Sequence, residues 1–360
     1  MTFDITSYRL HNQRISQADL ATPTDVVSWF GAVQSQDFLG AKWAIGLRTN
    51  GLNEADVDRA YADGSILRTH LLRPTWHFVT PADIRWLLAL TAPRVRAQLR
   101  YMDRQLELDN ALLERSNTVL EKTLRGGKHL TRVELGSALE ERGINTDDLR
   151  LTHLVMHAEL DGVLCSGPRQ GKQFTYALLE ERVPQTNALE RHEALAEITK
   201  RYFTGHGPAT LKDFVWWSGL SVTDAKRGLE TVKSEFEHEI LMDETYWFSP
   251  SQPKKPVTKA VLLPSYDEYT VGYTDRRAIF DASHADKLDA RGSILAQNAI
   301  LVHGRVVGAW KRTLKKNSVV MAATLFKEMK KNETHAIIEA AERYANFLNL
   351  PFSLDFGETQ

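Results

Sequence analysis

Cysteine is nearly absent from this chain, which has 360 residues and one thiol, Cys165. A lone thiol excludes an intramolecular disulfide, and the N-terminus lacks the basic start and apolar stretch of an export signal, so we expect a cytoplasmic protein. Long apolar runs are missing as well, and we expect no membrane-spanning segment. Neither sign of charge is in excess, because the formal net charge is −1. Binding to nucleic acid would therefore require local basic patches.

The composition is that of an ordinary globular protein, with 42% hydrophobic and 25% charged residues. The length is sufficient for two or three domains with substantial cores. Helix starts are clearly marked, since Thr22, Pro23 and Asp25 together predict a capped helix that begins at the proline. The same pattern of threonine, proline and aspartate recurs at 80–83 and predicts a second helix start.

The order helix, turn, helix and two-stranded hairpin occurs three times, and it is the layout of a winged helix. The three passes cover 8–79, with a hairpin at 66–79, then 130–178 and 189–248. A linker of proline, serine and lysine at 249–260 precedes strand-like segments that include 260–273, a hairpin turning at His303-Gly304, a helix at 332–348 and a last strand.

We therefore predict an α+β fold that is mostly helical, with three tandem winged-helix modules and a small C-terminal β-barrel-like module. The predicted domains are a first winged helix with a helical bridge, a second and a third winged helix, and the C-terminal module, at 1–126, 127–184, 185–250 and 257–360.

Winged helices bind DNA through a recognition helix and a basic hairpin, although they also serve as packing or protein-contact modules. The second hairpin carries Arg169 and Lys172 at its tip, which favours contact with phosphates. A second basic stretch surrounds a tryptophan, as in a nucleic-acid groove, and the alternative is a strand edge protected by lysines. Its residues are Arg305, Trp310, Lys311, Arg312, Lys315 and Lys316.

Three other patterns are weaker than they first look. His153 and His157 share a helix face, but Leu154 replaces the general-base glutamate of a zinc motif and no third ligand is nearby, so we expect no metal site. The segment 167–172, GPRQGK, resembles a phosphate loop, yet it is one residue short and forms a hairpin turn. Cys165 is expected to be a small buried hydrophobe.

The segment AVQSQDFLG places two glutamines, Gln34 and Gln36, just after an apolar helix. Residues two apart diverge on a helix but share a face in an extended chain, with Ser35 and Asp37 on the other side. The glutamines can act together only if the helix ends by about residue 33, and Gly31 favours such an end.

Several motifs of this chain occur in the same order in a known family. They are FGAVQSQDFLGAKWAIGLR, ILRTHLLRPTWHFVTPADIRWLLALTAPR, DFVWWSGLS, LLPSYDEY and HGRVVGAWKR. Together they resemble the bacterial winged-helix DNA glycosylases of the AlkZ type (AlkZ/YcaQ-like), whose tandem winged helices and β-barrel agree with the layout above. The resemblance covers nearly the whole chain, and the chain differs at Ser35, where characterised members prefer an aliphatic residue.

The resemblance implies a monofunctional glycosylase of base excision repair that removes N7- or N3-alkylated purines, and some members also unhook interstrand crosslinks. It assigns the catalysis to Gln34 and Gln36, needs no cofactor, and implies a bacterial, nucleoid-associated monomer that acts on double-stranded DNA with alkylated bases. An alkylated purine already carries positive charge and leaves without a general acid. Two carboxamides that orient a water would therefore suffice.

Three further residues are candidates for the cleft in which Gln34 and Gln36 would act on DNA. Asp37 is a conceivable general base, but it points away from the glutamines and is expected to be structural. Thr75 and His77 share a strand face opposite Trp76 and Phe78, and His77 either lines the cleft or is buried and bonded to the backbone. Two other functions stay open, a non-catalytic winged-helix regulator that binds undamaged DNA and a protein-interaction scaffold.

Overall fold

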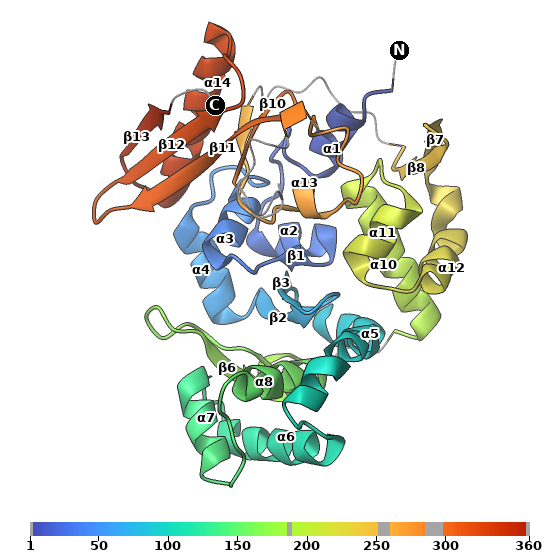
Figure 1. Ribbon diagram of the computed structural model, residues 1–360, viewed down its shortest axis with the longest axis vertical. Coiled ribbons are helices and arrows are strands. Elements are labelled where there is room, and N and C mark those ends of the chain that lie inside the picture. Colours follow the sequence, from blue (N-terminus) through green and yellow to red (C-terminus); the bar gives the residue numbers. More distant parts are fainter. Residues whose placement is uncertain (1–2, 186–188, 251–259, 282, 285–297, 358–360) are drawn as a thin grey trace.

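The computed structural model describes residues 3–185, 189–250, 260–281, 283–284 and 298–357. In these ranges no helix combines the length and the apolar character needed to cross a bilayer. The chain folds as a mixed α+β structure with a curled sheet at one end, a cluster of helices beside it and a smaller lobe below (Figure 1). Most of the linker predicted at 249–260 lies outside the described residues.

The N-terminal region alternates short helices with a three-stranded sheet of order β1-β3-β2. Thr22 caps α2 with its side chain and Asp25 completes the capping box, as the sequence predicts. The hairpin predicted at 66–79 is confirmed as β2 and β3, but the sequence did not reveal the edge strand β1. The elements are α1 (Ile5–Asn12), α2 (Pro23–Phe30), β1 (Val33–Gln34), α3 (Phe38–Gly46), α4 (Glu54–Asp63), β2 (Leu67–Leu71) and β3 (Thr75–Val79).

Two groups of helices follow, each with an antiparallel hairpin, and the first group begins with two long helices that lead into the lower lobe. The first group holds α5 (Ile84–Gln105), α6 (Asn110–Leu124), β4 (Leu130–Thr131), α7 (Arg132–Glu140), α8 (Arg150–Leu160), β5 (Leu164–Ser166), β6 (Thr175–Leu178) and α9 (Leu179–Arg182). The second holds α10 (Arg191–His206), α11 (Leu211–Ser218), α12 (Val222–Val232), the 3-10 turn η1 (Lys233–Glu235), β7 (Glu237–Leu241) and β8 (Glu244–Phe248).

The C-terminal region is a five-stranded sheet of order β13-β12-β11-β10-β9, in which only β13 runs parallel to its neighbour. Its elements are β9 (Ala260–Leu262), α13 (Glu268–Val271), β10 (Ala299–Val302), β11 (Arg305–Leu314), β12 (Val319–Leu325), α14 (Lys331–Leu348) and β13 (Phe352–Phe356). The predicted turn at His303-Gly304 is confirmed, with positive φ at both residues. Strand structure expected over 260–273 is limited to β9, because Asp267 caps a short helix that begins at Glu268.

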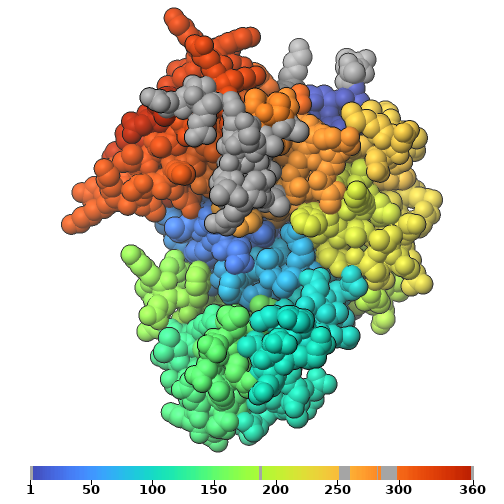
Figure 2. All heavy atoms as spheres, viewed as in Figure 1, coloured from blue at the N-terminus to red at the C-terminus, as the bar shows by residue number. Residues whose placement is uncertain are grey.

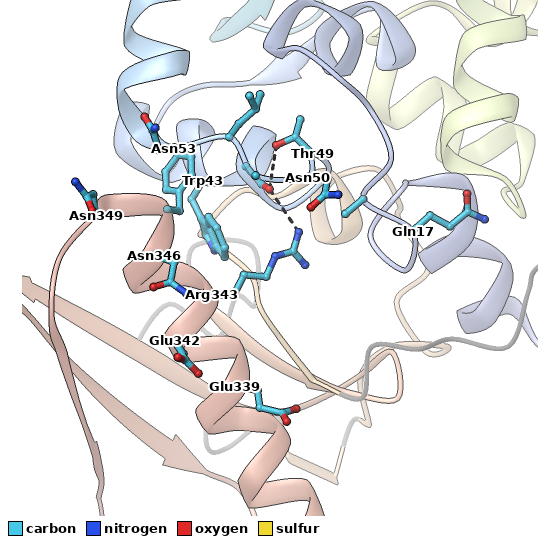
Figure 3. A pocket seen from close by; sticks show the side chains of 15 residues that line it. Gln17, Trp43, Thr49, Asn50, Asn53, Glu339, Glu342, Arg343, Asn346 and Asn349 are labelled. Carbon is cyan, nitrogen blue, oxygen red and sulfur yellow. Dashed lines mark hydrogen bonds between the residues drawn. The ribbon is translucent and has the colours of Figure 1, made fainter.

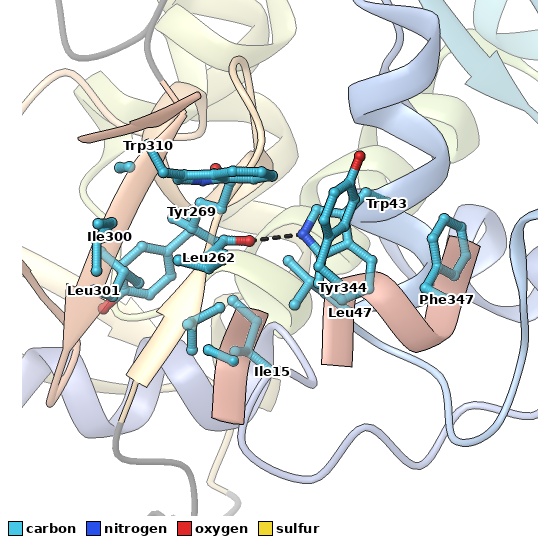
Figure 4. Packing of buried hydrophobic residues seen from close by; sticks show 14 of the residues in the cluster. Ile15, Trp43, Leu47, Leu262, Tyr269, Ile300, Leu301, Trp310, Tyr344 and Phe347 are labelled. Atoms are coloured by element: carbon cyan, nitrogen blue, oxygen red, sulfur yellow. Dashed lines mark hydrogen bonds between the residues drawn. The ribbon is translucent and has the colours of Figure 1, made fainter. Parts of the chain in front are cut away.

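One hydrophobic core joins the two ends of the chain. Trp43 of α3 packs against Tyr344 and Phe347 of α14, and its indole N–H donates to the Leu262 carbonyl at 2.7 Å (Figure 4). The buried side chains of α2 and α3 belong to the same cluster as those of β9 to β12. The N-terminal strand β1 therefore packs on a hydrophobic core that includes residues of β9 to β12 and of α14.

Candidate functional site

The glutamine pair lies on a non-helical segment between two helices. Helix α2 ends at Phe30, Gly31 follows with φ +79°, and α3 begins only at Phe38. In between, Gln34 belongs to β1, and the Ser35 N–H donates to the Trp76 carbonyl of β3 at 2.8 Å. The predicted end of the helix before Gln34 is thus confirmed, and Gln34 is extended, whereas Gln36 lies in the bend that leads into α3. That both amides share a face stays a prediction.

The two glutamines differ in their environments. Gln34 is 7% exposed, and its Oε1 has no hydrogen-bond partner among the described residues. Gln36 is exposed in the bend that precedes α3. The Ser35 side chain is fully buried on the other side, and its Oγ is likewise unpaired within the described part of the chain. The site therefore presents one sequestered and one accessible carboxamide.

His77 lies directly opposite Gln34 on the neighbouring strand β3. It is 1% exposed, and its Nδ1 contacts the Thr75 carbonyl at 3.0 Å, whereas its Nε2 finds no partner in the described ranges. Burial, with a smaller effect of the Arg73 charge, lowers the pKa of His77 to about 3. The hydroxyls of Thr69, which faces His77 on β2, and of Thr75 are also buried without a described partner. Polar groups thus form a row across this sheet.

A buried carboxylate supports the glutamine strand from the C-terminal region. Glu268, at the start of α13, accepts the Gln34 backbone N–H at 2.9 Å on Oε1. Its Oε2 lies 2.9 Å from the indole nitrogen of Trp217 and 3.0 Å from His206 Nε2. Burial alone would raise the pKa of Glu268, but these hydrogen bonds and the nearby His206 outweigh it and lower the pKa to about 2. The carboxylate is therefore charged at neutral pH.

Arginines and aromatic rings surround the exposed end of the site. Arg68 of β2 donates from Nε and a terminal nitrogen to the Ser35 carbonyl at 3.2 and 3.1 Å, and lies over the Trp76 ring at 4.3 Å. Arg169, at the tip of the β5–β6 hairpin, lies 5.1 Å from the ring of Phe38. The basic tip predicted at Arg169 and Lys172 is thus brought to the start of α3, two residues beyond Gln36.

The C-terminal sheet brings a second set of basic side chains toward the same segment. Arg312 of β11 lies 3.5 Å from an Asp37 carboxylate oxygen, which also accepts from the Ser265 hydroxyl at 3.2 Å. Asp37 is therefore engaged as a tie between the N-terminal and C-terminal regions. Lys311, Lys315 and Lys316 are exposed beyond it. Figure 2 shows a recess between the sheet in red and orange and the light-green hairpin, with blue N-terminal atoms at its base.

Two of the predicted DNA contacts do not belong to this set. Trp310 is 2% exposed, donates its indole N–H to the Leu263 carbonyl at 2.8 Å and packs on Tyr344. It is a core residue and is not accessible for stacking on a base, which corrects the sequence prediction. Arg305 is exposed at the opposite end of β11, beside the N-terminal residues Thr6 and Arg9. Its distance along the strand separates it from Lys315 and Lys316.

The histidine pair of α8 has a third neighbour that the sequence did not suggest. Asp103 of α5 places one carboxylate oxygen 3.0 Å from His153 Nδ1 and 3.1 Å from His157 Nε2. The three donor atoms lie close enough together to hold a metal ion, so the expectation that no third ligand is nearby was wrong. Because both imidazoles already contact the carboxylate, the group also ties α5 to α8. Cys165 is fully buried as predicted, which raises the pKa of its thiol to about 12.

A separate hollow of about 720 Å³ lies between the end of α3 and α14. Figure 3 shows it lined by side-chain amides, among them Asn50, Asn53 and Asn346, with Arg343 donating to the Gly46 carbonyl. None of the glutamine, histidine or glutamate groups described above lines this hollow. Of the residues around the glutamines, Glu268 and Arg68 were missed by sequence reasoning, although Glu268 lies within the LLPSYDEY motif.

Two neutral amides on a segment that is contacted by arginines of the β5–β6 hairpin and of β11 suit an enzyme that acts on nucleic acid. Residues 27–347 match the family model described as DNA glycosylase AlkZ-like. The chain belongs to this family and is a DNA glycosylase, an enzyme that hydrolyses the N-glycosidic bond between a base and its sugar.

The chain is also similar to a curated protein and to a solved structure. The interstrand DNA cross-link repair glycosylase of Streptomyces sahachiroi is 25% identical over 328 residues, which cover 85% of this chain and 86% of the relative. The solved structure of Streptomyces sahachiroi DNA glycosylase AlkZ superposes with a TM-score of 0.78 at 21% identity, over 98% of this chain and 100% of that one. At this identity the structural likeness establishes a shared fold.

Proposed function

We propose that this DNA glycosylase removes N7- and N3-alkylated purines from double-stranded DNA, and that Gln34 and Gln36 orient the hydrolytic water. The observation that carries the proposal is the buried Gln34 Oε1, which lacks a partner among the described residues. The one carboxylate of the same segment, Asp37, is engaged by Arg312. A neutral amide can hold a water and offer negative dipole to the sugar, but it cannot protonate a leaving base. This chemistry suits a base that alkylation has already made cationic.

The same chemistry extends to interstrand crosslinks whose bridging group is attached to a purine nitrogen. The Streptomyces relative is named for crosslink repair. An alkylated purine in a crosslink is as activated a leaving group as a methylated one, so no additional catalytic group is required. We propose that crosslink unhooking by this chain uses the same two glutamines.

DNA is proposed to lie against the basic side chains on both sides of the recess. Arg169 and Lys172 approach from the second hairpin, and Lys311, Lys315 and Lys316 from β11 and its following turn. Contacts of this kind neutralise phosphates and carry no sequence information. We further propose that the chain is a monomer with three winged-helix modules, divided as predicted from the sequence. Arg312 is proposed to position Asp37 and to face the DNA.

The test is release of N7-methylguanine from an alkylated duplex under single-turnover conditions. Wild type is expected to release the base, and Gln34→Ala and Gln36→Ala are each expected to be slowed by about 10²-fold or more, the range for a lost transition-state contact. Gln105→Ala, an exposed glutamine at the end of α5, is the matched control and should retain full activity.

Two outcomes would contradict the assignment. If wild type released no base yet bound undamaged duplexes with sequence preference, the chain would act as a regulator on this fold. If both glutamine variants released base at the wild-type rate, glycosylase activity would stand but its assignment to the pair would fail.

A further inference from the structure

The hydrogen bonding of His77 defines which of its nitrogens carries the proton. Its Nδ1 lies 3.0 Å from the Thr75 carbonyl oxygen, which can only accept, so Nδ1 must donate. In the neutral ring, Nε2 is then a lone-pair acceptor. Burial keeps the ring neutral by lowering its pKa to about 3. His77 Nε2 is therefore an acceptor throughout the physiological pH range.

The strand register places this acceptor beside the carboxamide of Gln34. Ser35 donates its backbone N–H to the Trp76 carbonyl, which makes those two residues the hydrogen-bonded pair of the ladder. The preceding pair, Gln34 and His77, is then a non-hydrogen-bonded pair. Side chains of such a pair project from the same face with Cβ atoms about 4.5–5.5 Å apart.

Two buried hydrogen-bond acceptors that lie side by side both need a donor. Gln34 Oε1 and His77 Nε2 cannot bond to each other, and neither has a partner among the described residues. Leaving both unsatisfied costs about 1–3 kcal/mol each. A molecule with two donors and a free lone pair satisfies both, and water is the smallest such molecule.

The geometry points to His77 as a catalytic residue that accepts one hydrogen of the hydrolytic water, while Gln34 Oε1 accepts the other. This inference rests on the proposed function, and it refines the role of the exposed Gln36, whose amide then offers its negative dipole to the sugar while Gln34 and His77 hold the water. With both hydrogens held, the oxygen lone pair of the water is free to face the sugar. The C1′–N9 bond breaks and its electron pair neutralises the cationic purine, the lone pair forms the new C1′–O bond, and one proton leaves through His77 Nε2 to solvent.

The two carboxylates described near the pair already have partners. One oxygen of Asp37 is engaged by Arg312 and Ser265. Both oxygens of Glu268 are occupied, one by the Gln34 backbone and the other by Trp217 and His206. A weak base suffices, because a water that has bonded to an oxocarbenium-like carbon is strongly acidic and gives up its proton readily.

The test compares His77→Phe, which fills the space without an acceptor, with His77→Gln, whose amide group reaches the position of Nε2. His335→Phe, an exposed histidine of α14, is the control. For each we would measure single-turnover release of N7-methylguanine, the Kd for the lesion duplex and the melting temperature. We expect His77→Phe to lose about 10²-fold in rate with a Kd within threefold of wild type, and His77→Gln to recover at least tenfold over it.

The outcomes separate this inference from the proposed function. Base release by wild type with equal rates in all variants would overturn the role of His77 alone, and no release by wild type would overturn the proposed function with it. If His77→Phe does not fold, the single-turnover rate of His77→Gln and the pH profile of the wild-type rate test the role of His77 instead. We expect a wild-type rate that is flat between pH 6 and 8, and a rate that rises on acidification would require a protonated ring and refute the inference.

Discussion

Replacement of Glu268 by glutamine is the sharpest test of how the glutamine strand is supported. The substitution keeps the shape of the side chain but removes the charge that the Gln34 N–H, Trp217 and His206 surround. Because the fold lowers the pKa of Glu268 from 4.5 to about 2, the charged carboxylate stabilises the folded state at neutral pH by about 3 kcal/mol relative to a carboxyl whose pKa is unshifted. We expect Glu268→Gln to lose roughly that amount.

The expected loss can be measured as a melting temperature. The entropy of unfolding is about 2 cal/mol/K per residue, so 3 kcal/mol in a chain of 360 residues corresponds to about 4 °C if the chain unfolds as one unit. Differential scanning calorimetry at pH 7 would compare wild type with Glu268→Gln. Glu339→Gln on α14, whose side chain is 62% exposed, should leave the melting temperature unchanged.

The pH dependence provides the decisive result. A carboxyl whose folded pKa is depressed contributes stability above its unfolded pKa, and this contribution is lost as the pH falls through the folded value. The gap between wild type and Glu268→Gln should therefore be full above pH 4.5 and should shrink toward pH 2. A melting temperature that is unchanged at pH 7, or a gap that widens on acidification, would refute this account of the site.

Three further predictions concern stability. Ser35→Ala removes a buried, unpaired hydroxyl and should raise the free energy of unfolding by about 1 kcal/mol without slowing base release, whereas a loss of stability would reveal a partner for the hydroxyl. Arg48→Met leaves the buried Asp267 carboxylate unpaired and should cost about 3–5 kcal/mol by urea unfolding, with a smaller loss when Asp267→Leu is added. Gly219→Ala, at φ +68° and with the new Cβ 2.3 Å from a backbone oxygen, should destabilise clearly more than Gly51→Ala, which has positive φ but open space.

Local signals in the sequence predicted local structure well. The capping residues at Thr22 and Asp25, the hairpin at 66–79 and the turn at His303-Gly304 depend on neighbouring residues alone, and all are present. The strand β1 is only two residues long and pairs with a partner over 40 residues away, so no periodicity could reveal it. Its extended conformation was inferred from Gly31 and from the chemistry that the glutamines would need.

The errors arose where tertiary packing decides between two faces of one element. Trp310 lies among basic residues in sequence, yet its side chain is on the face of β11 that packs against α14, where the ring is buried. Nothing in the alternation of β11 tells which face a distant helix covers. Asp103 and Glu268 were missed for a related reason, since each meets its partners across 50 residues or more.

The core shared by the two ends of the chain has a consequence for biosynthesis. The residue that holds the Gln34 backbone is Glu268, which lies 234 positions later, and Trp43 packs against a helix near the C-terminus. A ribosome delivers Gln34 long before either partner has been made. A chain that stops before these partners have been made therefore cannot assemble the site, and the capacity to cut glycosidic bonds arises only after Glu268 and α14 have been synthesised.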